Sequence, residues 1–213
     1  MAGHFIVLEG LEGAGKSSAI STIKRFLYPL GLELVITREP GGTEVGEAVR
    51  QIIKTSIPDE PLDPCAELLL FYAARVQLIE RVIRPALARG AVVLADRFEL
   101  STFAYQGGGR KINFEFIQQL SVACVRGLQP DLTLFLDLKP EQGLERAIMR
   151  GKIDRIESES IDFFHDVYHA YHDNITKFQN VVMIDASKPL GKVQHLIRAA
   201  LQNYMDTHGQ RVT

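Results

Sequence analysis

The run GLEGAGKS at residues 10–17 limits how this chain can fold more than any other feature of its sequence. It follows the apolar, β-rich run HFIVLE at 4–9 and leads into a helical pattern that begins near Lys16. A strand, a loop of the form G-x-x-x-x-G-K-S and a helix, in that order, are typical of an α/β protein that cradles phosphates. The alternative is a glycine turn before an ordinary helix, which is disfavoured because the strand, the complete motif and the helix occur together.

Each residue type in this loop suits the binding of a nucleoside triphosphate. Glycines let backbone N–H groups converge on phosphate oxygens at the start of the helix. Lys16 is expected to reach the β- and γ-phosphates and to act in catalysis, and the Ser17 hydroxyl is expected to reach Mg²⁺. The residues predicted to bind ATP are Gly10, Leu11, Glu12, Gly13, Ala14, Gly15, Lys16, Ser17 and Ser18.

A carboxylate is also expected near the metal ion. Two apolar runs end in aspartate, AVVLAD at Asp96 and LTLFLD at Asp137. An acid at the end of a strand beside such a loop is typical of a partner for Mg²⁺ or its water. Either aspartate would alternatively cap the segment that follows it. Asp96 is favoured because Arg97 follows it directly, and proximity to Ser17 decides between the two.

Short β-rich apolar runs alternate with longer stretches of helical period along the whole chain. Strands are predicted at 4–9, 33–37, 91–96, 132–137 and 181–185. Helices are predicted at about 15–29, 44–54, 65–89, 113–127, 141–150, 159–178 and 189–207. Buried strands that alternate with helices form a mostly parallel sheet, so the predicted fold class is α/β. No repeat or linker divides the sequence, which predicts a single domain over 1–213.

The composition excludes several classes of protein. The 213 residues are 46% hydrophobic and 23% charged, which suffices for a core and excludes a disordered tail. A net charge of −2 argues against a nucleic-acid polymer as a partner. The first apolar run is too short for a signal peptide or a membrane span, which predicts a cytoplasmic protein. Cys65 and Cys124 lack CxxC spacing and are expected to be small buried residues in a reducing compartment.

Two segments indicate a second, anionic ligand beside the triphosphate. TREPGG at 37–42 follows a predicted strand, and the Arg38 fork suits a phosphate monoester, although a surface arginine in a turn is the alternative. FYAAR at 71–75 places Phe71 and Arg75 on one helical face, where they suit stacking on a base and hydrogen bonding to its edge. The alternative for Phe71 is an ordinary core position, but a core-facing Arg75 needs an acceptor.

A third segment, DRFELSTFAYQGGGR at 96–110, follows the AVVLAD strand and is too polar for a simple connector. It contains Arg97, Ser101, Thr102, Tyr105 and Gln106 before three glycines, which are expected to flex beside the acceptor. The three segments together predict that the chain binds a small phosphorylated acceptor as well as a triphosphate.

These motifs resemble those of bacterial thymidylate kinases. The resemblance rests on GLEGAGKS, TREPGG, FYAAR, DRF-x-LST-x-AYQGGGR, PDLTLFLDL-x-PE-x-GL-x-R and DRIE at 154–157, and it covers nearly the whole chain. It implies the P-loop nucleoside-monophosphate-kinase fold, with a five-stranded parallel sheet of order 2-3-1-4-5, and a homodimer. The implied reaction transfers a phosphoryl group from ATP to dTMP, with Mg²⁺, and produces dTDP for dTTP synthesis.

The resemblance also implies a role for each matching side chain of the acceptor site. It assigns the dTMP phosphate to Arg38 and Arg97, of which Arg97 is also implied in catalysis. It assigns thymine stacking to Phe71 and the carbonyl edge of the base to Arg75. The remaining implied contacts are Thr102 and Gln106 to the base, Tyr105 to the deoxyribose and Glu12 to the sugar 3′-hydroxyl.

A mobile lid is expected at about 146–157, RAIMRGKIDRIE. Phosphoryl transfer depends on charge neutralisation, and the loop carries Glu12 where some family members carry arginine. Arg146 and Arg150 share a helical face and Arg155 follows the helix, which resembles the lid-arginine type of the family; Arg150 and Arg155 are the predicted catalytic pair. The alternative is a solvated helix end, and Glu157 is a candidate to hold Mg²⁺ or the lid.

Two features depart from these expectations or distract from them. Phe98 stands where the family usually has tyrosine or histidine, which removes a polar group. His165, His169 and His172 share a helical face, but no thiolate accompanies them, so an otherwise polar, solvated face is favoured over zinc. Two alternative functions remain, a kinase for another monophosphate and an ATP-dependent regulatory switch; Phe71, Arg75 and residues 96–110 argue against the switch.

Overall fold

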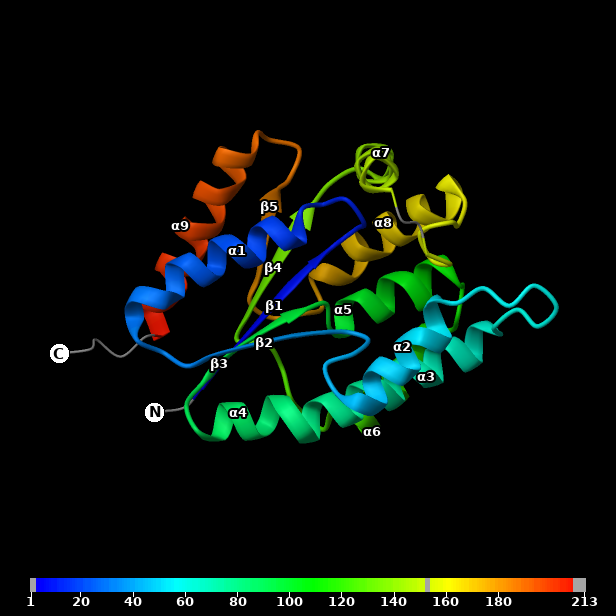
Figure 1. The fold of residues 1–213 in the computed structure, drawn as a ribbon, viewed down its shortest axis with the longest axis horizontal. Coiled ribbons are helices and arrows are strands. Elements are labelled where there is room, and N and C mark those ends of the chain that lie inside the picture. Colours follow the sequence, from blue (N-terminus) through cyan, green and yellow to red (C-terminus); the bar gives the residue numbers. More distant parts are fainter. Residues whose placement is uncertain (1–2, 152–153, 209–213) are drawn as a thin grey trace.

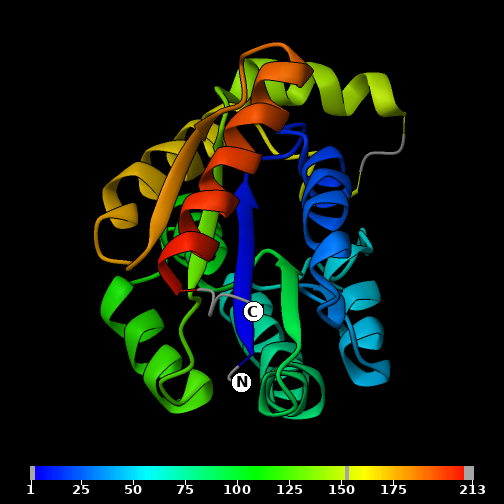
Figure 2. The same cartoon turned by 90° about the vertical axis from the view of Figure 1, so that its left-hand side faces the viewer.

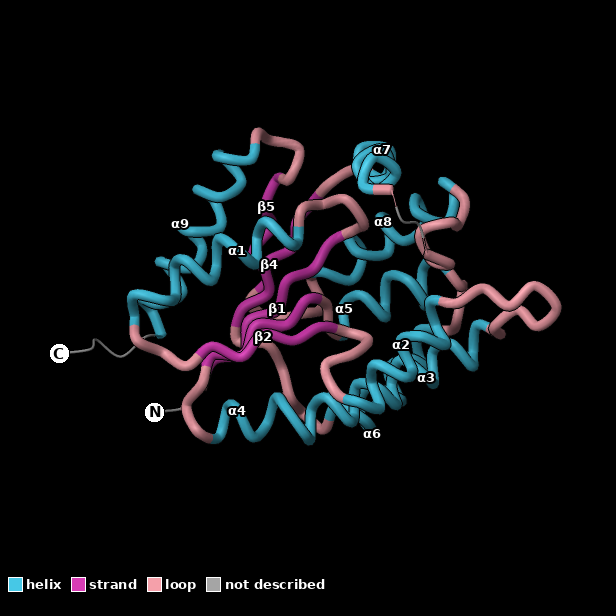
Figure 3. The backbone as a smooth tube through the Cα atoms, viewed as in Figure 1, coloured by secondary structure: helices cyan, strands magenta, loops and turns pink. Residues whose placement is uncertain are grey.

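A computed structural model describes residues 3–151 and 154–208. Five strands form one parallel sheet of order β2-β3-β1-β4-β5, as predicted (Figures 1 and 3). The strands are β1 (His4–Gly10), β2 (Leu34–Arg38), β3 (Val92–Asp96), β4 (Leu132–Asp137) and β5 (Val181–Asp185). Every boundary lies within one residue of the predicted one.

The α-helices are α1 (Lys16–Leu27), α2 (Glu44–Lys54), α3 (Pro64–Leu78), α4 (Arg84–Ala88), α5 (Glu99–Thr102), α6 (Phe114–Val125), α7 (Pro140–Arg150), α8 (Ile161–Ile175) and α9 (Leu190–His208). A 3₁₀ turn follows α1 at Tyr28–Leu30, and two π-helical stretches, Ile79–Ile83 and Phe103–Gly109, continue α3 and α5. The predicted helix at 65–89 is therefore a continuous α3, π and α4 segment. The helical character of 99–109 was not predicted.

Alternation along the strands builds two cores, one on each face of the sheet. Ile6 and Leu8 of β1 face α1 and α9, whereas Phe5 and Val7 face the other side, toward α3, α4 and α6. Figure 1 shows these two helical layers with the sheet between them. Seen from the side in Figure 2, α7 lies beyond the carboxyl end of β1, the edge where parallel α/β sheets bind ligands.

Capping residues start several helices. The Thr43 side chain accepts a hydrogen bond from the Gly46 N–H at the start of α2, and the Asp63 side chain caps α3, where Pro64 occupies the first helical position. At the end of α7, Gly151 adopts a φ of 103° and terminates the helix. Local sequence therefore sets these helix boundaries.

The three consecutive glycines at 107–109 are not a flexible element, and that expectation was wrong. They form the last part of the π-helical stretch, which packs closely against α8. A Cβ at Gly108 would lie 2.3 Å from the Ala170 Cβ, and one at Gly109 would lie 2.4 Å from the Phe163 ring. Glycine is needed here because the backbones approach closely.

Substitution of Gly108 tests this packing. We expect Gly108→Ala to lower the free energy of unfolding by about 2 kcal/mol, because the added methyl overpacks the contact with α8. Urea denaturation measures the change. Gly191→Ala is the matched control, since nothing lies within 4 Å of a Cβ there and alanine favours helix. Equal stability of the two variants would contradict the packing role.

The two cysteines differ in environment. Cys124 is half-buried, but Cys65 is exposed in the first turn of α3, so the expectation that both are buried was wrong for Cys65. The helical pattern placed Cys65 in the helix but did not reveal its face. Among the described residues, no helix is both long and apolar enough to cross a membrane.

Candidate active site

A cavity of about 600 Å³ opens at the carboxyl ends of the central strands. It brings together most of the side chains predicted to act on the two ligands. Those that line it are Glu12, Gly13, Gly15, Lys16, Ser17, Ser18, Arg38, Phe71, Arg75, Asp96, Arg97, Thr102, Tyr105, Gln106 and Arg150. The strand register contributes directly, because Arg38 of β2 lies opposite Asp96 of β3.

Four predicted residues do not line the cavity. Gly10, Leu11 and Ala14 belong to the phosphate loop but lie beneath its surface, and Leu11 and Ala14 are buried in the core. Arg155 is directed elsewhere: its Nε donates to the Ile53 carbonyl at 2.7 Å and its Nη2 bonds to Glu67. The expectation that Arg155 lies over the triphosphate is therefore not met in this arrangement.

The phosphate loop is shaped by glycine. Gly13 has a φ of 72° and Gly15 a φ of 95°, and a Cβ at Gly13 would lie 2.0 Å from the Gly143 carbonyl oxygen of α7. Lys16 Nζ donates to the Gly10 and Leu11 carbonyls, each at 3.0 Å, which holds the ammonium over the loop. Burial and the nearby Arg97 lower the pKa of Lys16 to about 8. A phosphate would relieve both effects by supplying negative charge.

The two candidate aspartates have different surroundings. Asp96 lines the cavity together with Ser17, and its Oδ1 is buried with no hydrogen-bond partner among the described residues. Asp137 bonds to His172 at 3.2 Å and lies outside the cavity lining. A buried, unpartnered carboxylate oxygen in a residue that shares a cavity with a hydroxyl suits a hard cation such as Mg²⁺. Asp96 is therefore the better candidate.

Arg97 joins the phosphate loop to the predicted acceptor segment. It follows β3 with a φ of 72°, and its Nη2 bonds to Glu12 Oε1 at 2.6 Å and to the Tyr105 hydroxyl at 3.1 Å. Its Nη1 donates to Ser101 and Tyr171. Burial raises the pKa of Glu12, but the charges of Arg97 and Lys16 outweigh it and hold that pKa below its usual value. Glu12 also accepts a hydrogen bond from Tyr105.

Arg75 is buried, with only 1% of its surface exposed. Its Nε and Nη2 bond to Glu39 Oε2 at 2.8 and 2.7 Å, and Nη2 also donates to the Thr102 hydroxyl at 2.8 Å. Its Nη1 has no hydrogen-bond partner within the described part of the chain, and neither has Glu39 Oε1. Nη1 instead lies 3.6 Å from Glu99 Oε1, an ion pair too long for a hydrogen bond. The Arg75 side chain lines the cavity and keeps unused hydrogen-bonding capacity.

Arg38 and Phe71 lie at different depths of the cavity lining. The Arg38 side chain is 53% exposed and bonds to both carboxylate oxygens of Glu47, at 2.9 and 3.0 Å. Phe71 is partly buried: it packs against the cluster of Val49, Ile53 and Ala74 and also lines the cavity, so it is more than a core residue. Both side chains are accessible to a ligand from the cavity.

The predicted lid is tied to α2 through Lys54 and to α3 through the pair of Arg155 and Glu67. Lys54 pairs with Asp154 at 2.5 Å, and Arg150 pairs with Glu157; all four side chains line the cavity. Arg146 donates to the Ala186 carbonyl at 3.3 Å and also lines the cavity. Residues 152 and 153 of the predicted lid lie outside the described residues.

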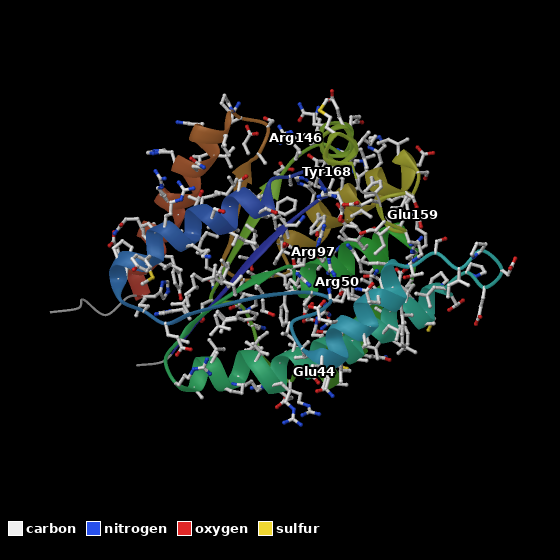
Figure 4. All side chains as sticks on the ribbon, viewed as in Figure 1. Glu44, Arg50, Arg97, Arg146, Glu159 and Tyr168 are labelled. Atoms are coloured by element: carbon white, nitrogen blue, oxygen red, sulfur yellow. The ribbon has the colours of Figure 1, made fainter. Side chains whose placement is uncertain are left out.

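Sequence reasoning missed Arg50, which lines the cavity, and Glu9, which lies buried beneath it. Arg50 of α2 lines the same cavity as Arg97, and both are labelled in Figure 4; Arg50 donates to the Pro40 carbonyl at 2.8 Å. Arg50 lies one helical turn after the buried Gly46 and so on the same, inward face of α2, a spacing from which it could have been predicted. Glu9 is buried and accepts hydrogen bonds from the Phe98 and Ser101 N–H groups at 2.9 and 3.2 Å. An acid at the end of an apolar strand was its signal.

Two further expectations are altered by packing. Helix α8 is not otherwise polar, because it buries Phe163, Phe164, Val167 and Tyr171. His165 pairs with Glu141 at 3.1 Å and His172 with Asp137, so these side chains serve contacts to neighbouring segments. Phe98 packs edge-on against Phe5, and the Arg75 guanidinium lies over its ring at 5.3 Å. Its backbone bonds to Glu9 and Arg75.

A parallel sheet of this order, a phosphate loop and a second group of cationic and aromatic side chains in the same cavity define a P-loop nucleoside monophosphate kinase. A family model described as thymidylate kinase matches residues 8–197. The chain is 51% identical to a thymidylate kinase of Legionella pneumophila (strain Corby) over 206 residues, which cover 97% of each chain. It is 50% identical to a thymidylate kinase of Shewanella amazonensis over 200 residues, 93% of this chain and 96% of the other. The chain therefore belongs to the thymidylate kinase family, as its motifs predicted.

Proposed function

We propose that this chain transfers the γ-phosphoryl group of ATP to dTMP, producing ADP and dTDP for dTTP synthesis. The observation that carries the proposal is the contact between Arg97 and Glu12, which joins the donor loop to the acceptor segment at 2.6 Å. Because the donor and acceptor sites adjoin in one cavity, the γ-phosphate of ATP can contact the phosphate of dTMP directly. Family membership supports dTMP as the acceptor and ATP as the donor.

The donor site consists of residues 10–18. Backbone N–H groups of the loop and the N-terminus of α1 would hold the phosphates of ATP, and Lys16 would lie along the β- and γ-phosphates. Ser17 and Asp96 would hold Mg²⁺, which neutralises phosphate charge when it is bound. The unpartnered Oδ1 of Asp96 supports this assignment.

The acceptor site extends from Arg97 to α3. Arg38 and Arg97 would hold the phosphate of dTMP, and Arg50, which lines the same cavity, adds a third cation. Phe71 would stack on thymine. Arg75, which lines the cavity, would donate to a carbonyl of the base, with Thr102 and Gln106 as further contacts. Tyr105 and Glu12 would flank the deoxyribose, where a 2′-hydroxyl clashes with Tyr105.

The reaction forms one bond and breaks one. An oxygen of the dTMP phosphate attacks the γ-phosphorus, and the bond from that phosphorus to the β–γ bridging oxygen breaks. No general base is needed, because the attacking phosphate oxygen carries no proton. The protein positions the two phosphates and neutralises their charge with Lys16, Arg97 and Arg150. Arg150 reaches the cavity from the lid, where Glu157 now holds it.

Arg150 is expected to act mainly in the transition state. We expect Arg150→Ala to lower kcat about a hundredfold and to raise KM for dTMP far less, because the guanidinium meets charge that develops during transfer. Steady-state kinetics measure both constants. Arg198→Ala, on the exposed face of α9, is the control and keeps wild-type kinetics. An unchanged kcat in Arg150→Ala would refute the lid assignment.

We also propose a cytoplasmic homodimer. Exposed apolar side chains on α3 and α6 support association through these helices, which pack side by side: Leu69 is 47% exposed and Val122 is 67% exposed. Light scattering on the purified protein measures the mass. A mass of 23.8 kDa at micromolar concentration would mean a monomer and contradict this part of the proposal.

Substrate preference tests the proposed reaction. Phosphorylation of dTMP, dUMP, dCMP and AMP is measured side by side with ATP as the donor. We expect the highest kcat/KM for dTMP. A higher value for any other monophosphate would assign the chain to a different acceptor.

A further inference from the structure

Glu67 is a buried carboxylate that contacts both the base end of the cavity and the lid. It lies in the first turn of α3 with 1% of its surface exposed. Its Oε1 accepts hydrogen bonds from Gln106 Nε2 at 2.9 Å and from Arg110 Nε at 3.2 Å. Its Oε2 accepts from Arg110 Nη2 at 3.3 Å and from Arg155. Glu67 has no role in the proposed phosphoryl transfer, so a buried carboxylate at this position indicates another function.

The surroundings keep this carboxylate ionised. Two guanidinium groups contact it, and Arg110 is held in place by Glu159 at 2.6 Å and by the Phe163 ring. Burial raises the pKa of Glu67, but Arg110 and the hydrogen bonds from Arg155 and Gln106 outweigh burial, so that the pKa is lowered. An ionised carboxylate accepts hydrogen bonds and cannot donate one.

The ionised carboxylate determines which way the Gln106 amide points. A carboxamide has one end that donates and one that accepts. Because Glu67 only accepts, Gln106 must turn its NH₂ group toward Glu67. Gln106 lines the cavity, and no group of the described chain donates to its Oε1. The atom left for a ligand is therefore an acceptor.

Thymine and cytosine differ at N3, the ring atom that the Gln106 Oε1 acceptor would contact. The ring N3 of thymine carries a hydrogen and donates, whereas the N3 of cytosine carries a lone pair and accepts. With Oε1 facing the base, Gln106 accepts a hydrogen bond from N3–H of thymine and is repelled by the N3 lone pair of cytosine. If the amide were flipped, Nε2 would face the base and would favour cytosine. Holding the amide in one orientation therefore rejects the wrong base.

We propose that Glu67 is a positioning residue that sets base specificity, by holding Gln106 so that the acceptor site selects a base whose N3 carries a hydrogen. The inference rests on the proposed function, because it takes the contact between Gln106 and the base as given. The same carboxylate anchors Arg155 of the lid segment. Glu67 therefore links the part of the site that reads the base to the segment proposed to cover ATP.

Glu67→Gln tests this role. The new amide can donate as well as accept, so Gln106 becomes free to turn over. We expect the ratio of kcat/KM for dTMP to kcat/KM for dCMP to fall about tenfold, because a mismatched buried hydrogen bond no longer penalises cytosine fully. Arg75 is unchanged and still favours thymine. A merely structural role would lower both kcat/KM values and keep their ratio, and that result would overturn the proposal.

The matched control is Glu159→Gln, which removes the other carboxylate bound to Arg110 but leaves the bond between Glu67 and Gln106. We expect it to keep the wild-type ratio; an equal fall in this variant would also overturn the proposal. Failure of the wild-type chain to phosphorylate dTMP would contradict the proposed function instead, and is distinguishable from an unchanged ratio in Glu67→Gln.

A second measurement applies if Glu67→Gln does not fold. Hydrogen exchange of the Gln106 side-chain amide is followed by NMR in the ligand-free wild-type protein, with the resonance assigned from Gln106→Met. We expect slow exchange, because Nε2 is buried and bonded to Glu67. Exchange as fast as that of the exposed Gln119 would overturn the proposal.

Discussion

Replacing Lys16 with methionine is expected to lower kcat about a thousandfold while leaving the protein folded. Within residues 3–151 and 154–208, the Lys16 ammonium bonds only to the Gly10 and Leu11 carbonyls of its own loop, and Lys16 lines the cavity that would hold the triphosphate. Methionine keeps the length and the apolar stem of the side chain but removes the charge that neutralises the transferred phosphoryl group. Pre-steady-state measurement of dTDP formation at saturating ATP and dTMP gives the rate of the chemical step.

Lys24→Met is the matched control for this prediction. Lys24 lies on the exposed face of the same helix, α1, so its replacement makes the same chemical change away from the cavity. We expect wild-type kcat in the control and similar thermal midpoints in both variants. A kcat within tenfold of wild type in folded Lys16→Met would mean that residues 10–17 do not hold the reacting phosphates.

Replacing Arg75 with leucine is expected to lower the free energy of unfolding by about 4 kcal/mol. Arg75 is paired with the buried Glu39 at 2.7 Å and lies 3.6 Å from Glu99, so its loss leaves two carboxylates without their cation in the core. Burial already raises the pKa of Glu39 to about 7, against the opposing effect of Arg75. Urea denaturation at pH 7.5 measures the loss.

An exposed ion pair provides the control for Arg75. Arg89 bonds to Glu33 at 2.7 Å, but both side chains are about half exposed, at 49% and 51%. Arg89→Leu is expected to change the free energy of unfolding by less than about 1 kcal/mol. Adding Glu39→Gln to Arg75→Leu should recover part of the lost stability, because the uncompensated charge is then removed. Equal effects of Arg75→Leu and Arg89→Leu would contradict this account of the buried pair.

The elements that could be predicted are determined by residues close to one another in the sequence. β1 alternates between two cores, the phosphate loop has glycines where φ is positive, and Thr43 and Asp63 cap their helices, so a short window of sequence suffices for each. The strand order and the roles of the acceptor-site residues came from the family resemblance. Residue patterns alone indicated the triphosphate loop and a second, anionic ligand near Arg38, Phe71 and Arg75, but not which ligand that is.

The elements that were missed depend on distant partners. Gly107–Gly109 disfavour a helix locally, yet they form the end of a π-helical stretch because α8 packs directly on them. Arg155 turns away from the cavity because Glu67, 88 positions earlier in the chain, takes its guanidinium. Glu9 ends an apolar strand, which is a local signal, but its bonds come from the Phe98 and Ser101 N–H groups, 89 and 92 positions later. No local pattern contains these contacts.

The dependence of ADP formation on dTMP tests the central claim most directly. ADP and dTDP are measured together after mixing the purified chain with ATP and Mg²⁺, with dTMP present or absent. The account predicts that ADP forms at an appreciable rate only with dTMP and that one dTDP appears for each ADP. Hydrolysis of ATP at the same rate with and without dTMP, and no dTDP, would contradict it and favour an ATP-dependent switch.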